Sequence, residues 1–176
     1  QDGSPVVTRT DRQRYMLTPS LRWQPSDDTS LTVLGQWLKS KSGEDPYYAV
    51  AADLSLTRVK MGDYSFSDFD QDQWSLGYEF EHRFNGTWSF QQNARYSEVS
   101  LDRRAIWVNE LQADAHTYSR FARTWNDGIK QLSFDSRING SLNTGVIEHV
   151  IVAGVDYNHE TGTALRRRGT APDLLV

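Results

Sequence analysis

Two adjoining stretches decide the fold: WSLGYEFEHRF at residues 74–84 and WSFQQNARY at residues 88–96. In each stretch an apolar or aromatic side chain stands at nearly every second position, and Gln92 interrupts the second row. A period of two is typical of a β-strand with one apolar and one polar face. Asn85-Gly86, the strongest two-residue hairpin signal, lies between the stretches. Residues 74–96 are therefore predicted to form an antiparallel hairpin.

The same alternation recurs in four further windows around this hairpin. Residues 15–23 and 31–37 precede it and are separated by a turn-forming cluster at residues 25–29. Residues 132–142 and 147–157 follow it and are joined by Asn143-Thr144-Gly145, and the first of these two windows is also compatible with a start as early as Tyr118. Strands joined by short turns favour a meander, so we expect an all-β, antiparallel, up-and-down fold of about six long strands.

The connections between these windows alternate between short turns and long segments. The long ones are residues 40–72, residues 98–116 and the tail after Asn158, which we expect to be loops. Outer-membrane β-barrels have short turns on one side of the membrane, long loops on the other, and strands with an apolar outer and a polar inner face. The pattern therefore predicts part of a transmembrane outer-membrane β-barrel.

The spacing of aromatic residues agrees with the thickness of a membrane. Tyr15 and Trp23 are eight residues apart on one predicted face, which is about 27 Å at ~3.3 Å per residue. With a strand tilt of ~40°, the pair spans about 20 Å along the membrane normal, close to the ~25 Å apolar band between aromatic girdles. Polar residues between the apolar ones, including Glu79, Arg95 and Asp135, suit a wet lumen.

Composition excludes several classes of protein. The net charge is -4, from 19 basic and 23 acidic residues, so no uniform basic field is present and we expect no nucleic-acid partner. The absence of cysteine excludes disulfides and cysteine zinc sites. The longest apolar runs are about six residues, against ~20 for a membrane-spanning helix. No signal peptide is readable at Gln1.

Alternating aromatic residues also fit a soluble, aromatic-rich carbohydrate-binding β-sandwich, which stays open as an alternative. The sandwich would bury its aromatic rows in a core, whereas the barrel would expose them. The four histidines lack zinc-site spacing and no serine lies in a nucleophile elbow, so no enzyme, catalytic residue or metal site is expected. An outer-membrane lipase is the enzymatic alternative. The run at residues 166–168, three arginines, is either a solvated cluster or a basic loop for an anionic ligand or lipopolysaccharide phosphates.

Three stretches, in order along the chain, resemble the barrel of TonB-dependent ferric siderophore receptors, the ferrichrome and hydroxamate type in particular. They are residues 14–25 with 27–32, residues 69–84 with 88–96, and residues 147–157, which end in Gly154-Val155-Asp156-Tyr157. Because the stretches cover nearly the whole chain in the right order, the resemblance is specific to the family.

The resemblance implies a barrel of roughly 22 strands with an N-terminal plug and an energy-coupling box. Neither plug nor box is recognisable in the sequence. Six strands cannot close even the smallest barrels, which have ~8. Residues 1–176 are therefore expected to be an internal part of the receptor's β-barrel domain, with the plug and the remaining strands absent.

The resemblance also implies a function: uptake of ferric siderophores through the cell outer membrane of a Gram-negative bacterium. The partners would be the ferric siderophore, the outer-membrane lipid and the TonB complex, the last through the missing N-terminal region. A related receptor for cobalamin or haem is the alternative within transport. Tyr47 and Tyr48 are the implied ligand-binding residues, because aromatic rings can cover a bulky, partly apolar chelate. Iron would stay inside the siderophore, so no cofactor and no protein metal ligand is expected.

Overall fold

The computed structural model describes residues 11–43, 47–51, 53–63 and 65–175, and every regular element in this part of the chain is a β-strand. Among these residues no helix is long and apolar enough to cross a membrane. The strands are β1 (Arg12–Leu17), β2 (Ser20–Ser26), β3 (Thr29–Gly43), β4 (Tyr48–Val50), β5 (Leu56–Lys60), β6 (Asp68–Arg83), β7 (Trp88–Leu111), β8 (Thr117–Thr144) and β9 (Ile147–Leu175).

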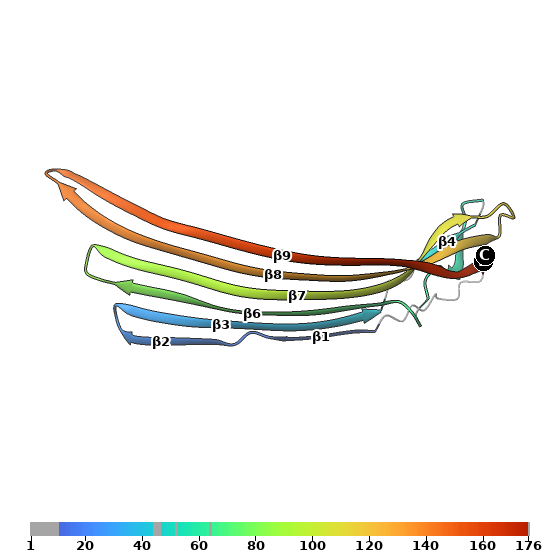
Figure 1. Cartoon of the computed structure of the whole chain (residues 1–176), viewed down its shortest axis with the longest axis horizontal. Helices are drawn as coiled ribbons and strands as arrows, with labels where there is room; N and C mark the ends of the chain where they lie inside the picture. Colours follow the sequence, from blue (N-terminus) through green and yellow to red (C-terminus); the bar gives the residue numbers. More distant parts are fainter. Residues whose placement is uncertain (1–10, 44–46, 52, 64, 176) are drawn as a thin grey trace.

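One antiparallel sheet holds all strands except β4 and β5, in the spatial order β1-β3-β6-β7-β8-β9 (Figure 1). β2 continues β1 along the same edge of β3, and the two are separated at Thr18-Pro19. Pro19 has no N–H to donate, and its carbonyl accepts a hydrogen bond from Gly35 N at 2.9 Å. Each predicted window therefore corresponds to one strand of the sheet, with β1 and β2 together forming the first. The predicted all-β meander of about six strands is confirmed.

The last three strands are much longer than the predicted windows: β7 has 24 residues, β8 has 28 and β9 has 29. The prediction that residues 98–116 and the tail after Asn158 are loops is wrong, because both mainly extend strands. Charged residues enter both faces of these extensions, so the apolar alternation fades while the backbone pairing continues. Only residues 40–72 contain a long connection, and it includes the small β4–β5 hairpin.

The β6–β7 hairpin is present, but its turn is not the one that Asn-Gly usually forms. Gly86 does not adopt a positive φ. Instead the side chain of Asn85 closes the turn: its Oδ1 accepts hydrogen bonds from Thr87 N and Trp88 N, both at 2.9 Å. Phe84 N donates to Trp88 O at 3.0 Å, which leaves a three-residue loop at 85–87. The predicted turn before β9 does use a glycine with positive φ, Gly145 at 65°.

The register joins the apolar rows of separate strands into one face, called here the apolar face. Directly opposed residues in neighbouring strands lie on the same side of a sheet. One such row across the strands is Val33, Tyr78, Ala94, Phe134 and Tyr157. The adjacent row lies on the opposite side, the polar face, and consists of Thr32, Glu79, Asn93, Asp135 and Asp156.

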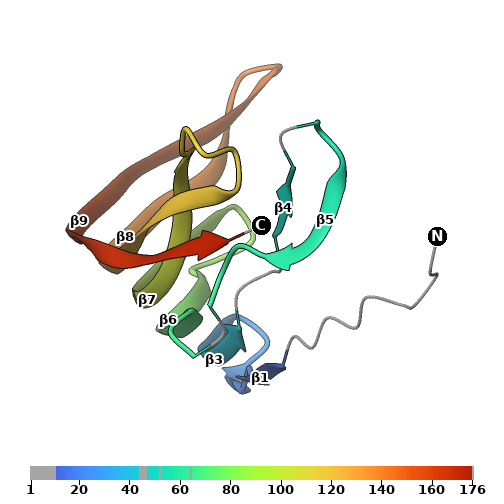
Figure 2. The same ribbon diagram turned by 90° about the vertical axis from the view of Figure 1, so that its right-hand side faces the viewer.

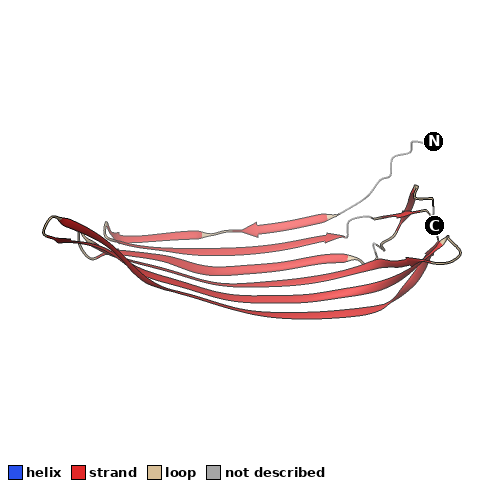
Figure 3. Ribbon diagram, turned by 90° about the horizontal axis from the view of Figure 1, so that it is seen from above, coloured by secondary structure: helices blue, strands red, loops and turns tan. Residues whose placement is uncertain are grey.

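No second layer covers the apolar face in the described residues, as the single long layer in Figure 3 shows. Trp23, Leu76 and Val155 are 59%, 56% and 66% exposed. A soluble sandwich would bury such residues between two sheets, so the sandwich alternative is wrong and the aromatic rows are exposed as the barrel requires.

The apolar face becomes ionic just beyond Trp37 and Trp74. On the same side of the sheet, the next positions carry cross-strand ion pairs. These pairs are Lys39–Asp72 and Lys41–Asp70 at 3.5 Å each, Lys130–Glu98 at 3.3 Å, and Arg104–Asp68. Aromatic residues followed by a belt of charges mark the edge of an apolar band. The long ends of β7, β8 and β9 extend beyond this edge.

Candidate ligand-binding site

The two tyrosines predicted to bind ligand lie side by side in the chain but in different surroundings. Tyr47 precedes β4 and is 44% exposed, and its ring centroid lies 6.3 Å from that of Trp107 in β7. Tyr48 lies in β4 opposite Lys60. Its hydroxyl is buried and has no hydrogen-bond partner within the described residues. The structure therefore places the ring of Tyr47 next to that of Trp107, which lies 60 positions later in the chain.

The β4–β5 hairpin lies beside the end of β7 and the start of β8, on either side of the turn that joins these two strands (Figure 2). It holds Tyr47 against Trp107 of β7. Two hydrogen bonds from β8 fix the hairpin there: Tyr118 Oη donates to Val50 O at 2.6 Å, and Arg120 Nη1 to Met61 O at 3.1 Å. Within the hairpin, Met61 N donates to Tyr47 O at 2.9 Å. Asp63 closes the turn that follows, because its carboxylate accepts hydrogen bonds from the hydroxyl and N–H of Ser65. These bonds lower the pKa of Asp63.

An arginine–aromatic cluster occupies the polar face at the same end of the sheet. Cross-strand pairing sets its residues in three rows. The first row is Arg103, Trp125 and Arg166, the second is Ala105, Arg123 and Arg168, and the third is Trp107, Phe121 and Thr170. The register continues without a shift from the polar residues Arg95 and Asp135 to these rows, so the cluster lies on the polar face.

Guanidinium groups in this cluster lie over aromatic rings. Arg103 Cζ is 5.1 Å from the Trp125 ring centroid and 5.7 Å from that of Trp107. Arg123 Cζ is 5.3 Å from the Trp125 ring. These distances are typical of cation–π contacts, which attract a cation without neutralising its charge. Trp107 and Trp125 contact each other edge-on, with centroids 6.3 Å apart.

The arginine run at residues 166–168 is part of β9 and not a loop. Because side chains alternate along a strand, Arg166 and Arg168 lie on the polar face and Arg167 lies on the other. Arg168 Cζ is 3.9 Å from the Phe121 ring centroid, and Arg166 pairs with Asp127 through an Nη2–Oδ2 contact of 2.9 Å.

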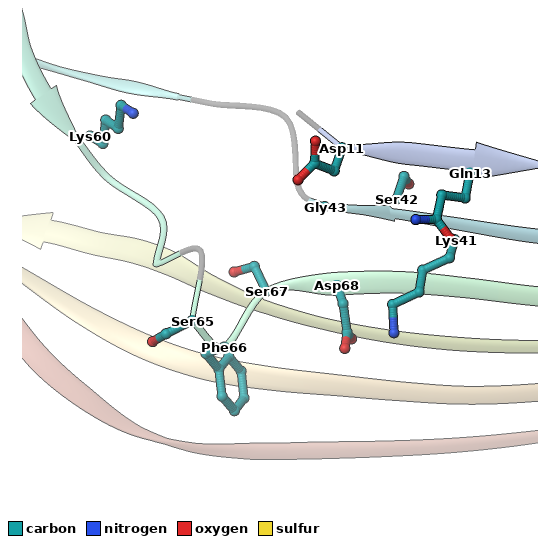
Figure 4. Close-up of a pocket in the computed structure, with 10 residues that line it drawn as sticks. All are labelled: Asp11, Gln13, Lys41, Ser42, Gly43, Lys60, Ser65, Phe66, Ser67 and Asp68. Atoms are coloured by element: carbon teal, nitrogen blue, oxygen red, sulfur yellow. The ribbon is translucent and has the colours of Figure 1, made fainter. Parts of the chain in front are cut away.

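A separate hollow of about 670 Å³ lies at the ends of β1, β3 and β6 (Figure 4). Gln13, Lys41 and Asp68 line it. By strand alternation these three side chains belong to the apolar face, the side that carries Trp37 and Trp74. The hollow therefore opens, at least at these three side chains, toward the apolar face and away from the side of the sheet that carries Trp107.

Sequence reasoning missed the arginine–aromatic cluster. Trp107 fell in a predicted loop, and Trp125 fell between Tyr118, the earliest predicted start of the fifth strand, and the best-defined part of that strand at residues 132–142. One signal was present, because apolar residues alternate through Val99, Leu101, Ala105 and Trp107 and so continue the strand. No group of three His, Asp or Glu side chains in the described part of the chain is placed to hold a metal ion.

Comparison with known proteins gives a consistent family signal. Residues 17–174 match the family model described as TonB dependent receptor-like, beta-barrel. The ferrioxamine receptor of Yersinia enterocolitica is 29% identical over 151 residues, which cover 82% of this chain and 21% of that protein. The ferrichrome outer membrane transporter/phage receptor of Escherichia coli is 24% identical, over 84% of this chain and 23% of that protein. The chain thus spans about a fifth to a quarter of the length of these relatives.

A solved structure has the same fold. The ferric-catecholate import receptor Fiu of E. coli superposes with a TM-score of 0.70 at 18% identity, and the match covers 89% of this chain and 28% of that one. The antiparallel sheet described above therefore has the geometry of a sector of a large barrel.

Proposed function

We propose, from the premise that this chain belongs to the TonB-dependent receptor-like β-barrel family, that it forms part of the wall of a receptor for ferric siderophores. Proteins of this family lie in the outer membrane of Gram-negative bacteria, and this chain lies there too. In such a barrel the apolar face contacts lipid and the polar face lines the lumen. The open edges of the sheet, at β1–β2 and at β9, pair with further strands of the complete receptor, because unpaired backbone groups are too costly in lipid.

The complete receptor transports its cargo and catalyses no reaction. Its family consists of receptors and transporters. Iron enters as a ferric siderophore and stays bound to the siderophore, so this segment supplies no metal ligand and needs no cofactor. The TonB complex energises uptake through other parts of the receptor.

The observation that carries the proposal is the contact of Tyr47 with Trp107 at the outer end of the polar face. Long connections face the outside in such barrels, and the long connection between β3 and β6 lies at the end that holds Tyr47, so we assign that end to the outside. Aromatic rings at this position can cover a bulky, partly apolar chelate. The Tyr48 hydroxyl is buried and has no partner in the described residues, so an oxygen atom of the chelate would satisfy it only after a shift of the β4–β5 hairpin.

The test is the binding of ferric siderophores to the complete receptor in detergent, measured by quenching of tryptophan fluorescence. Tyr47→Ala should weaken binding about tenfold, which corresponds to ~1.4 kcal/mol, because it removes a ring that covers the ligand. Tyr48→Phe should weaken binding about two- to tenfold, since one hydrogen bond contributes ~0.5–1.5 kcal/mol.

The matched control is Tyr157→Ala, which removes a ring from the lipid-contacting apolar face and should leave the affinity unchanged. Unchanged affinity in both the Tyr47 and the Tyr48 variants would place the ligand elsewhere in the barrel. A receptor that binds haem or cobalamin and no ferric siderophore would contradict the proposed cargo.

A further inference from the structure

We propose that the arginine–aromatic cluster selects ferric chelates with a net negative charge. The inference rests on the proposed function and deepens it, because it names the chemical class of the cargo. The cluster lies on the lumen side of the sheet, near Tyr47, and nothing in the relatives' names assigns it a ligand.

The cluster carries a surplus of positive charge. Arg103, Arg123, Arg166 and Arg168 share one small area of the polar face, and Asp127, which pairs with Arg166, is the one carboxylate that contacts them in the described part of the chain. Guanidinium groups stay protonated at any physiological pH, so the surplus cannot be removed by titration. An anionic ligand would neutralise it.

The polar face nearer the periplasmic turns has no comparable surplus. There Glu79, Glu81, Asp135 and Asp156 are mixed with Arg95 and Arg137. The positive surplus is therefore confined to the outer end of the polar face, where a ligand arrives from outside the cell.

The geometry of the guanidinium groups also favours an anionic ligand. Arg103 and Arg123 both lie against the ring of Trp125, and Arg168 lies over Phe121. An aromatic ring beside a guanidinium group holds that group flat against the ring. The ring is not a full hydrogen-bond acceptor for the N–H groups of the arginine. The N–H groups at its edge stay available for two-point contacts with carboxylate or catecholate oxygens.

The size of the cluster suits one small chelate. Neighbouring strands are about 4.8 Å apart and successive rows on one face about 6.6 Å apart, so two rows across three strands cover roughly 10 by 7 Å. All four arginines lie within these two rows. One compact metal chelate is large enough to contact several of them at once.

The charge of a ferric chelate depends on the groups that hold the iron. Three hydroxamate anions balance the charge of a ferric ion, so a simple ferric tris-hydroxamate is neutral. Each catecholate carries two negative charges, so a ferric tris-catecholate stays anionic, as does a ferric chelate with surplus carboxylates. The arginine–aromatic cluster favours the anionic chelates over the neutral ones.

The experiment compares two probes on the complete receptor in detergent: the ferric complex of a tripodal tris-catecholate and that of a trihydroxamate of similar size. The wild-type receptor should bind the anionic complex at least tenfold more tightly, and added salt should weaken that binding more than the binding of the neutral complex. Arg103→Gln combined with Arg168→Gln should lose at least tenfold in affinity for the anionic complex and little for the neutral one.

Arg167→Gln is the matched control, because Arg167 lies in the same strand on the opposite face and should not affect either probe. Binding of the neutral complex shows that the double variant is folded. Equal or tighter binding of the neutral complex by the wild type, or an unchanged preference in the double variant, would overturn the inference while the siderophore function stands. If neither complex binds to the wild type, both proposals fail.

Discussion

Gly140 lies directly opposite Trp88 in the β7–β8 pairing, and the indole ring covers it. A Cβ atom at position 140 would overlap with the ring atoms Cε3, Cζ3 and Cδ2 of Trp88. Gly140→Ala should therefore force the ring aside and destabilise the complete receptor by about 1–3 kcal/mol. The midpoint of thermal unfolding in detergent, read from the change in gel mobility, measures this loss.

Gly169→Ala is the control for this variant, since no atom lies within 4 Å of a Cβ built at that position. The same unfolding midpoint for both alanine variants would show that the ring of Trp88 does not need the space above Gly140.

The residues of the candidate site differ in how far sequence can predict them. Tyr47 follows from the family resemblance alone. Its neighbour Trp107 does not, because the two are brought together by the β4–β5 hairpin, and no local pattern encodes a contact across 60 positions. Arg103 lies within an apolar alternation that indicates a strand, but no local pattern places it beside Arg123, because the two residues lie in different strands.

The β6–β7 turn depends on the side chain of Asn85 and not on the flexibility of Gly86. Asn85→Ala removes the hydrogen bonds to Thr87 N, Thr87 Oγ1 and Trp88 N, and should cost about 1–3 kcal/mol in the free energy of unfolding. Gly86→Ala should have almost no effect, because Gly86 has no positive φ and a Cβ there meets nothing within 4 Å.

Denaturant unfolding of the two variants in detergent separates these effects. A large loss for Gly86→Ala with a small one for Asn85→Ala would indicate an ordinary two-residue Asn-Gly turn, which requires positive φ at both positions.

The β7–β8 turn should open in acid. The Asp114 carboxylate accepts hydrogen bonds from the hydroxyl of Thr117 and from the backbone N–H groups of His116 and Thr117, and these bonds lower its pKa from 3.8. A lowered folded-state pKa means that the carboxylate stabilises the turn fully above pH 3.8. That contribution is lost as the pH falls through the lowered value.

Hydrogen exchange at the amides of His116 and Thr117 measures this change. Their protection should fall as the pH drops from about 5 to about 2, after correction for intrinsic rates. Asp114→Asn cannot lose a charge, so its protection should stay constant over this range. A wild-type turn with constant protection would contradict the role of the carboxylate.

The halves of the strands inside the membrane were predictable from sequence, and the outer halves were not. Lipid requires an apolar side chain at every second position, so β2, β3 and β6 show a clear period of two. Outside the membrane, pairing with neighbouring strands continues but both faces are hydrated. For this reason the outer parts of β7 and β9 looked like loops in the sequence.

The two faces of the molecule should separate its six tryptophans into two groups in a membrane. Trp23, Trp37, Trp74 and Trp88 lie on the apolar face by strand alternation, whereas Trp107 and Trp125 lie on the polar face. In the complete receptor, brominated lipids should quench the fluorescence of the first group, and aqueous acrylamide should preferentially quench the second. Single-tryptophan variants measure each contribution. Quenching of Trp107 by brominated lipid would contradict the assignment of the faces.

The strands end at unequal heights. Asp68, the first residue of β6, pairs with Arg104, while β7 runs on to Leu111 and is paired there with β8. β7 continues over residues 105–111 beyond the start of β6. At ~3.3 Å per residue, the wall on the β7–β9 side is therefore about 23 Å higher than the wall at β6. The rim is thus a slope, and its tall side is the part of this segment that extends farthest beyond the belt of charges. In the complete receptor proposed above, that tall side would be the first part of this segment that a large molecule outside the cell meets.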